Sequence, residues 1–253
     1  MKILISPAKS LDYTSTLPTA ANSQPVFLAD AKKLNAALRQ KKPRDLQALM
    51  GISEKLAALN WERNHDFVTP FNANNSRPAV FAFSGDVYTG LDAYTLDENT
   101  IDVAQNSLRI LSGLYGFLKP LDLMQPYRLE MGTSFGINGY KTLYTFWKDK
   151  LTKYLKDELD TNELVINLAS KEYASAVDFK ALNNPVISPV FKDFKNGKFK
   201  IISFFAKKAR GLMSRHLLEK NASTIADVLS FKANGYFYSE AETTDANAPV
   251  FVR

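Results

Sequence analysis

Three short apolar runs constrain the fold of this chain of 253 residues more than any other feature. They span residues 2–5, 79–83 and 164–168, and a serine and then a charged residue follow each run. Short apolar runs of this kind are typical of buried strands. If the three strands are parallel neighbours, the loops after them meet at one edge of the sheet, where α/β proteins commonly hold ligands. We therefore expect Lys9, Asp86 and Glu172 to converge.

The loops after these runs supply most of a candidate pocket. Its expected residues are Ser6, Lys9, Asp86, Tyr88, Glu130, Ser170 and Glu172. A simpler alternative is that strands end in turn-forming residues, which explains the serines but not the charges. No glycine-rich nucleotide-binding motif follows any of the three runs, so the sequence specifies no known nucleotide site.

The scarcity of metal-binding and nucleophilic side chains excludes several classes of function. The chain has no cysteine, so disulfides, thiolate catalysis and cysteine-bound metals are excluded. Its only histidines, His65 and His216, are far apart in the sequence, which makes an imidazole-rich metal site unexpected. We predict no metal site and no cofactor. Lysine, tyrosine and carboxylate chemistry remains, but no catalytic motif is present, so the sequence favours a protein that is not an enzyme.

Composition places the chain among ordinary globular proteins. It is 45% hydrophobic, and no linker, repeat or low-complexity block divides it, so we predict a single domain over residues 1–253. No apolar run is long enough to span a bilayer, and the apolar stretch at the N-terminus is too short for a signal peptide. We expect a cytoplasmic protein without a membrane partner.

Positive charge is concentrated between residues 190 and 220. This segment has nine Lys and Arg against two acidic residues, an excess larger than the net charge of +6 of the whole chain. Local charge of this kind indicates an anionic partner, most often nucleic acid. Asn196-Gly197 lies between two alternating runs and predicts a tight β-hairpin in which Phe194 faces Phe199 and Asp193 faces Lys200.

Residues 205–218 after this hairpin have the spacing of an amphipathic helix. Its basic residues, Lys207, Lys208, Arg210 and Arg215, cover an arc of roughly 160°. Gly211 lies in the middle of that arc, where a glycine would let a backbone or a phosphate approach closely. The alternative is an ordinary solvated helix surface, although such surfaces usually mix Lys with Glu.

A second candidate for phosphate contact is a pair of helices at residues 43–50 and 54–59. Gly51 lies in the turn between them, and Ser53 is a plausible N-cap of the second helix. Such a turn can point backbone N–H groups at a phosphate, but any two antiparallel helices need a similar connection. We count Gly51, Ser53 and Lys55 as candidate DNA contacts, together with Lys9 and Arg128. A structural ion pair with Glu130 is the alternative role for Arg128.

Five stretches together resemble the YaaA family of bacterial peroxide-stress-resistance proteins. They are "ILISPAKSLDY", "FSGDVYTGL", "LSGLYGFLKPLDLMQPYRLEMG", "INLASKEY" and "KNGKFKIISFFAKKARGLMSR". The resemblance covers nearly the whole chain. It implies a mixed α and β (α+β) fold of the cantaloupe type, a single domain with a curved mixed sheet flanked by helices and with a helix–hairpin–helix motif.

The resemblance also implies a function. It implies a cytoplasmic DNA-binding protein of the hydrogen peroxide response that helps to keep intracellular iron low. Double-stranded or structured DNA is the expected partner, contacted through its phosphates. The alternative is an enzyme that acts on a nucleotide or nucleobase and uses the loops at Lys9, Asp86 and Glu172 for a small nucleotide-like ligand. A structural or protein-interaction module is a third interpretation.

Overall fold

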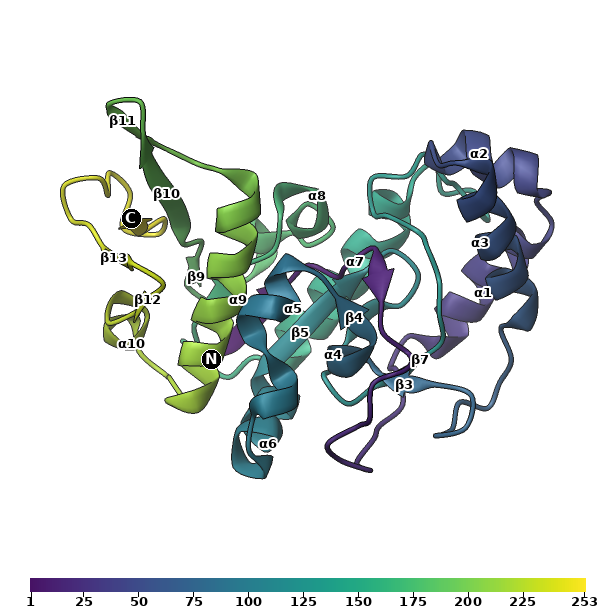
Figure 1. Cartoon of the computed structure of the whole chain (residues 1–253), viewed down its shortest axis with the longest axis horizontal. Coiled ribbons are helices and arrows are strands. Elements are labelled where there is room, and N and C mark those ends of the chain that lie inside the picture. Colours follow the sequence, from purple (N-terminus) through teal and green to yellow (C-terminus); the bar gives the residue numbers. More distant parts are fainter.

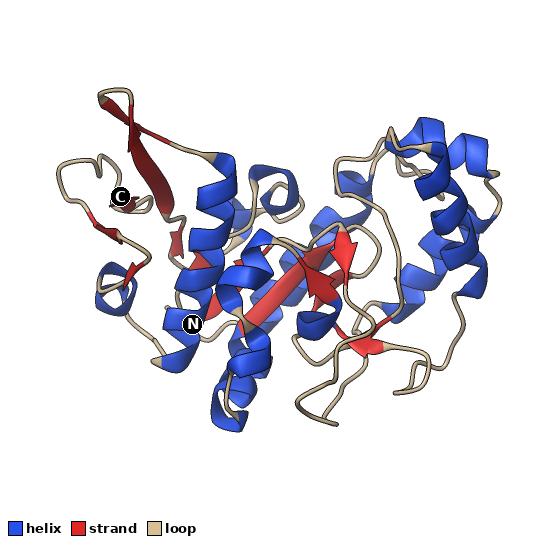
Figure 2. Cartoon of the chain, in the orientation of Figure 1, coloured by secondary structure: helices blue, strands red, loops and turns tan.

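A computed structural model describes residues 1–253 and contains helices and strands in several sheets, which confirms the mixed α/β composition (Figure 2). The α-helices are α1 (Leu28–Arg39), α2 (Pro43–Met50), α3 (Glu54–Asp66), α4 (Ala79–Ala82), α5 (Asp86–Leu91), α6 (Glu98–Ser107), α7 (Leu143–Glu158), α8 (Lys171–Ala174), α9 (Ser203–Glu219) and α10 (Ile225–Leu229), with 3₁₀ turns at Ala93–Thr95 and Phe179–Ala181. The strands are β1 (Lys2–Ile5), β2 (Ser10–Leu11), β3 (Arg77–Pro78), β4 (Phe83–Ser84), β5 (Leu108–Ser112), β6 (Gly116–Leu118), β7 (Leu123–Met124), β8 (Val165–Asn167), β9 (Val186–Ile187), β10 (Val190–Lys195), β11 (Lys198–Lys200), β12 (Lys232–Ala233), β13 (Tyr236–Tyr238) and β14 (Val250–Val252).

The central sheet has the strand order β6-β5-β1-β8-β9. β1 lies in the middle and is parallel to both β5 and β8, with Ile3 opposite Ile166 on β8. Ile3, Leu4 and Ile5 are almost completely buried, as expected for a parallel strand that is covered on both faces. The predicted strands at residues 2–5 and 164–168 are thus confirmed as parallel neighbours.

The predicted strand at residues 79–83 is wrong. Ala79–Ala82 form the single-turn helix α4, and only Phe83 and Ser84 are extended, as β4. All four residues of α4 are buried, so the apolar run has no periodicity that could separate a buried strand from a buried helical turn. β4 pairs antiparallel with β2, where Ser10 lies opposite Ser84. This pairing still brings the loop at Asp86 beside the loop after β1.

The second sheet has the strand order β11-β10-β14-β13-β12. The expected mixed sheet is therefore one of several, because the strands form two five-stranded sheets and two small two-stranded ones. The hairpin prediction is confirmed in its register, with Phe194 opposite Phe199 and Asp193 opposite Lys200. Asn196 and Gly197 have the positive φ angles of 55° and 75° that the tight turn requires.

The predicted helix at 205–218 is confirmed as α9, which packs closely against α5. Gly90 of α5 and Gly211 of α9 form the contact. A Cβ added at Gly211 would lie 1.9 Å from the carbonyl oxygen of Val87, and one added at Gly90 would lie 2.2 Å from the carbonyl oxygen of Lys208. The close approach that Gly211 permits is thus made by the backbone of α5.

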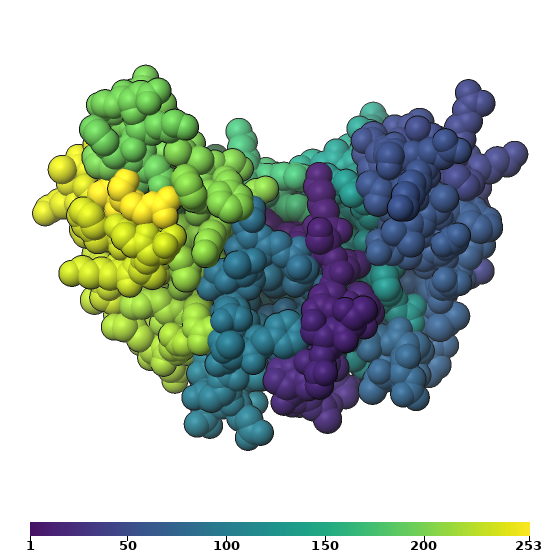
Figure 3. Space-filling model, in the orientation of Figure 1, coloured from purple at the N-terminus to yellow at the C-terminus, as the bar shows by residue number.

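Figure 1 shows how these parts are arranged around the central sheet. α1, α2 and α3 form one lobe, and the second sheet with α9 and α10 forms the other. The space-filling view shows a hollow between the dark-blue residues of the α2–α3 lobe and the green residues of β10, β11 and α9 (Figure 3). A cluster of 62 buried residues, from Ile3 to Phe251, forms the core. None of the helices combines the length and the apolar character that crossing a bilayer requires.

Candidate functional site

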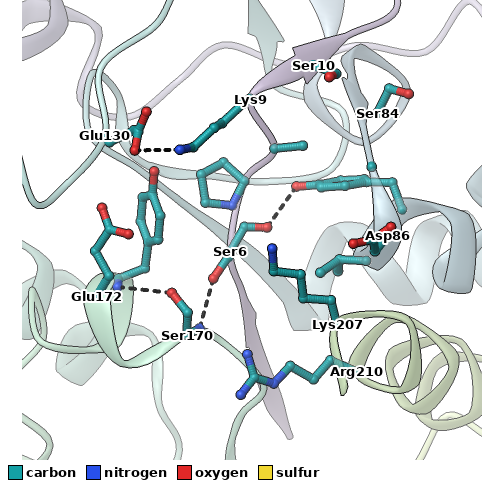
Figure 4. Close-up of a pocket in the computed structure, with 16 residues that line it drawn as sticks. Ser6, Lys9, Ser10, Ser84, Asp86, Glu130, Ser170, Glu172, Lys207 and Arg210 are labelled. Carbon is teal, nitrogen blue, oxygen red and sulfur yellow. Dashed lines mark hydrogen bonds and ion pairs between the residues drawn. The ribbon is translucent and has the colours of Figure 1, made fainter. Parts of the chain in front are cut away.

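A cavity of about 410 Å³ opens at the carboxyl end of β1. Its walls include the loop after β1, the start of α5, the loop between β8 and α8, and the first half of α9 (Figure 4). The polar and charged side chains that line it include Ser6, Lys9, Ser84, Asp86, Tyr88, Glu130, Ser170, Glu172, Tyr173, Lys207 and Arg210. All seven expected pocket residues therefore lie around one cavity, whose volume suits a small organic ligand.

Ser6 ties three of the walls together. Its hydroxyl oxygen accepts a hydrogen bond of 2.8 Å from the backbone N–H of Ser170, and its carbonyl oxygen accepts one of 3.1 Å from the hydroxyl of Tyr88. Ser170 in turn caps α8 by accepting a bond from the backbone N–H of Tyr173. Burial raises the pKa of the Tyr88 hydroxyl well above its usual value, so Tyr88 stays neutral and acts here as a donor.

Two carboxylates on one wall already have partners. Glu130 accepts 2.9 Å contacts from Lys9 and from Arg128, so the predicted Arg128–Glu130 ion pair is confirmed. Glu172 accepts a 2.9 Å hydrogen bond from the backbone N–H of Gly132. The side chain of Lys9 is 63% exposed and reaches over the opening from its Glu130 contact. These bonds hold the wall in place before any ligand binds.

The opposite wall carries charges without partners. Lys207 and Arg210 lie on one turn of α9, and neither side chain makes an ion pair or a hydrogen bond within the protein. Burial lowers the pKa of the Arg210 guanidinium, because a desolvated charge without an acidic neighbour is unfavourable. Asp86, on α5, faces the same cavity, and its carboxylate also accepts no hydrogen bond. An anion bound here would restore the interactions that Arg210 loses on burial.

Arg215 is placed differently, although the sequence groups it with Lys207 and Arg210. Its guanidinium donates to the carbonyl oxygens of Leu91 and Asp92, at 3.3 and 3.0 Å, and to the hydroxyl of Thr95 at 2.8 Å. It also forms a 2.8 Å ion pair with Glu219. Arg215 therefore fastens the end of α5 to α9, and its expected contact with DNA stays a prediction. Lys208 is half-buried beside the Gly90 contact and does not line the cavity.

The α2–α3 turn lies away from the cavity, in the other lobe (Figure 1). Gly51 ends α2 in the left-handed conformation with a φ of 60°, and no atom lies near the place where a Cβ would stand. Ser53 caps α3 by accepting a 3.4 Å bond from the backbone N–H of Leu56, so the predicted N-cap is confirmed. Gly51, Ser53 and Lys55 are all exposed. Their contact with DNA stays a prediction.

Sequence reasoning missed two features of the cavity. It did not select Tyr173, although this residue follows Glu172 and its ring forms part of the wall. It also assigned Lys207 and Arg210 to an open surface, whereas both line the cavity. Their spacing of three residues on a helix indicates a shared direction, but the sequence does not show what that direction faces.

The acidic side chains do not form a candidate metal site. No group of three or more His, Cys, Asp or Glu residues is arranged to hold a metal ion. Asp86 lies on the wall opposite Glu130 and Glu172, and Glu130 already contacts Lys9 and Arg128. The chemistry that the cavity offers is therefore recognition of an anion by two cations, with carboxylates and tyrosine hydroxyls for hydrogen bonds.

The fold and the site define a mixed α/β protein with a charged, ligand-sized cavity at the carboxyl end of β1, a parallel strand in the middle of a mixed sheet. The chain belongs to the family described as peroxide stress protein YaaA, whose model matches residues 1–242. It is 55% identical to a UPF0246 protein of Flavobacterium johnsoniae and 52% identical to one of Flavobacterium psychrophilum, in each case over the full length of both chains. A UPF0246 protein of Aliivibrio fischeri is 51% identical and is covered over 98% of its length. The family description supports a role in the peroxide stress response.

Proposed function

We propose that this protein binds DNA in the cytoplasm as part of the peroxide stress response. The DNA backbone would lie in the hollow between the two lobes, with a phosphate at Lys207 and Arg210. The observation that carries the proposal is that these two cations have no acidic partner and lie on the wall of a cavity that opens into the hollow. Cations that are already paired, such as Arg215, have little to gain from a phosphate.

The α2–α3 turn supports the same proposal from the other lobe. Its exposed backbone at Gly51 and the capped start of α3 at Ser53 have the form that a helix–hairpin–helix uses for a phosphate. Lys55 makes no ion pair and adds a positive charge beside this turn. Lys9 and Arg128 are further candidates, although both already contact Glu130. The cantaloupe-type fold implied by the family resemblance belongs to the same proposal.

The proposed route to low intracellular iron is indirect. The chain has no cysteine, and its acidic and histidine side chains form no cluster for a metal. Exposed carboxylates alone hold ferrous iron weakly. The protein would therefore lower iron through its effect on DNA rather than by storing the metal.

A salt series with the purified protein tests the proposal. Fluorescence anisotropy with a labelled duplex should give an affinity that falls steeply with salt, and replacing Lys207 and Arg210 with alanine should reduce the slope of log affinity against log salt by about 2. Replacing Lys55 should reduce it by about 1. The matched control is the Lys153→Ala, Lys156→Ala variant, which removes two exposed charges from α7. An unchanged slope in the Lys207, Arg210 variant would refute the proposed contact.

An enzyme acting on a nucleotide or nucleobase is the second candidate. The observation that favours it is the unpaired carboxylate of Asp86 in the same cavity as Lys207 and Arg210. A carboxylate in such a place can accept a hydrogen bond from a sugar hydroxyl or a base, or act as a general base. This candidate would be favoured over DNA binding by two results together. A free nucleoside monophosphate should stabilise the wild-type protein against heat but not Asp86→Asn, and the wild-type protein should release a product from it.

A further inference from the structure

The charges around the cavity balance one another. Three cations and three carboxylates line it, namely Lys9, Lys207, Arg210, Asp86, Glu130 and Glu172. Lys9 and Glu130 pair with each other at 2.9 Å, so two cations and two carboxylates are left without an ion-pair partner. A polyanion such as DNA gains most from a surface with an excess of positive charge. The balance therefore indicates that the interior of the cavity suits a different ligand.

The unpaired charges lie on two sides of the cavity. Lys207 and Arg210 extend into it from α9, and Asp86 lies near them at the start of α5 (Figure 4). Glu172 lies on the far side and accepts a 2.9 Å bond from the N–H of Gly132 with one oxygen, which leaves its other oxygen for a ligand. Carboxylates only accept hydrogen bonds, so both sides are satisfied by a ligand with one anionic end and several donors.

A phosphate monoester matches the two cations better than a phosphate within a DNA strand. A monoester carries a charge of about −1.5 to −2 at pH 7, whereas each phosphate of a strand carries a single charge. Arg210 can donate two parallel hydrogen bonds to it, and Lys207 adds a second positive charge. Burial lowers the pKa of the Arg210 guanidinium, and a dianion beside it would oppose that shift.

The rest of the cavity has the size and the polar groups for a sugar. Its volume of about 410 Å³ lies towards the lower end of the range of ligand pockets, which is about 300–1,000 Å³. Ser10 and Ser84 lie opposite each other on β2 and β4, and both line the cavity. The hydroxyls of a sugar can donate to Asp86 and Glu172 and can exchange hydrogen bonds with these serines.

We propose that the cavity binds a small phosphate monoester of a hydroxylated sugar, and that this ligand competes with DNA for Lys207 and Arg210. The competition rests on the proposed DNA binding, whereas the binding of the small ligand does not. A DNA phosphate reaches the two cations from the hollow, and neither cation can serve both ligands at once. The small ligand thus releases the protein from DNA without being converted.

Isothermal titration calorimetry tests the ligand class. Ribose 5-phosphate should bind at least about tenfold more tightly than ribose or inorganic phosphate at the same ionic strength, because only the sugar phosphate meets both sides of the cavity. The Lys207→Ala, Arg210→Ala variant should lose this binding. AMP in place of ribose 5-phosphate identifies the source of the sugar phosphate: tighter binding of AMP indicates a nucleotide, and weaker binding indicates a free sugar phosphate.

Asp86→Asn separates the two ligands. It should weaken binding of ribose 5-phosphate about tenfold, because a charged acceptor is lost, and it should strengthen DNA binding, because a negative charge near the DNA phosphate is lost. Asp149→Asn is the matched control, since Asp149 is an exposed carboxylate of α7, and it should change neither affinity.

Fluorescence anisotropy with a labelled duplex tests the competition. Ribose 5-phosphate at ten times its Kd should raise the apparent Kd of the duplex about tenfold over a sodium chloride control of equal ionic strength. The residual DNA binding of the Lys207→Ala, Arg210→Ala variant should not respond to ribose 5-phosphate.

The outcomes separate this inference from the proposed function. Ribose 5-phosphate that binds no more tightly than inorganic phosphate, or equally well to Asp86→Asn, would overturn the ligand class. Ribose 5-phosphate that binds through Lys207 and Arg210 without changing the DNA affinity would overturn the competition. In both cases a DNA affinity that falls with salt leaves the proposed function intact. A protein that binds ribose 5-phosphate but no DNA would instead refute the proposed function, and with it the competition, while supporting the small-ligand site.

Discussion

The two halves of α9 carry similar positive charges and use them in opposite ways. In the first half, Lys207 and Arg210 face a cavity and have no partner, so their charge is available to a ligand. In the second half, Arg215 makes four contacts with Leu91, Asp92, Thr95 and Glu219, so its charge is used to hold the fold. The difference teaches that a basic helix face is not one functional unit, and that the partners of each charge decide its role.

Gly211 lies between the two halves, and its replacement is expected to have the largest effect. In Gly211→Ala the new Cβ would meet the backbone of Val87, which cannot move as a flexible side chain can. We expect the free energy of unfolding to fall by about 3 kcal/mol, since overpacking outweighs the gain in helix propensity. Urea denaturation measures this. Gly51→Ala, where no atom lies within 4 Å, should lose only about 1 kcal/mol from its positive φ. Equal losses would contradict the packing explanation.

Removing one arginine from each half tests the comparison directly. Arg215→Ala should lower the free energy of unfolding by about 2 kcal/mol, because several hydrogen bonds are lost and backbone carbonyls lose their donor. Arg210→Ala should change stability little or raise it, since it removes a half-buried charge without a partner. For DNA binding we expect the opposite: Arg210→Ala should lose more affinity than Arg215→Ala. The comparison fails if both variants lose the same stability and the same affinity.

The second half of α9 also carries a pH-sensitive group, His216. Burial lowers its pKa below 6.5, although the Asp227 carbonyl and the nearby Glu219 oppose the shift and Lys220 adds to it. The ring also contacts Ser230 and Phe231. Because the folded state binds the proton less well, the stabilising contribution of the neutral ring is complete above about pH 6.5 and is lost as the pH falls through the folded-state pKa.

Urea denaturation at about pH 7.5 and about pH 5 checks this small effect. The loss of stability at the lower pH should be smaller in His216→Gln than in the wild type. His65 is the other histidine, so His65→Gln serves as the control and should keep the wild-type difference. A wild-type pH dependence that persists unchanged in His216→Gln would show that other groups cause it.

The smallest expected effect is on iron. The carboxylates near the first half of α9 form no metal cluster. Ferrous iron should therefore neither bind with a defined stoichiometry nor stabilise the fold. Anaerobic equilibrium dialysis measures the binding. A sub-micromolar site with fixed stoichiometry would overturn the proposal of an indirect effect on iron.

Local sequence patterns predicted several elements with their details. Asn196-Gly197 indicated both the turn and the register of its hairpin, because two positive φ angles in sequence allow few other structures. Ser53 indicated the start of α3, because its side chain satisfies a backbone N–H only three residues away. The parallel neighbours β1 and β8 followed from buried apolar runs. In each case the deciding interactions lie within a few residues or follow from burial alone.

Contacts between distant parts of the chain were not predictable in the same way. Residues 79–83 have the composition of a strand, but tertiary hydrogen bonds from Ala79 and Val80 to residues near Pro120 select a helical turn. The spacing of Arg215 is that of the basic face, and nothing in its neighbourhood in the sequence reveals Asp92 or Thr95 as partners. The convergence of Lys9, Asp86 and Glu172 around one cavity occurs although one of the three expected strands is absent. Sequence therefore indicated the participants in the site better than the contacts between them.

The contact of Gly90 with Gly211 has a consequence for how the protein can evolve. A side chain at either position collides with the opposite helix, so a mutation at one glycine cannot be repaired by a change at the other. Only a shift of the whole helix would accommodate it, and that shift would move Asp86 away from Lys207 and Arg210. Selection on the cavity therefore acts on two residues that never touch a ligand. Among descendants of this sequence, both glycines should persist together for as long as the spacing across the cavity matters, and both should be free to drift once it does not.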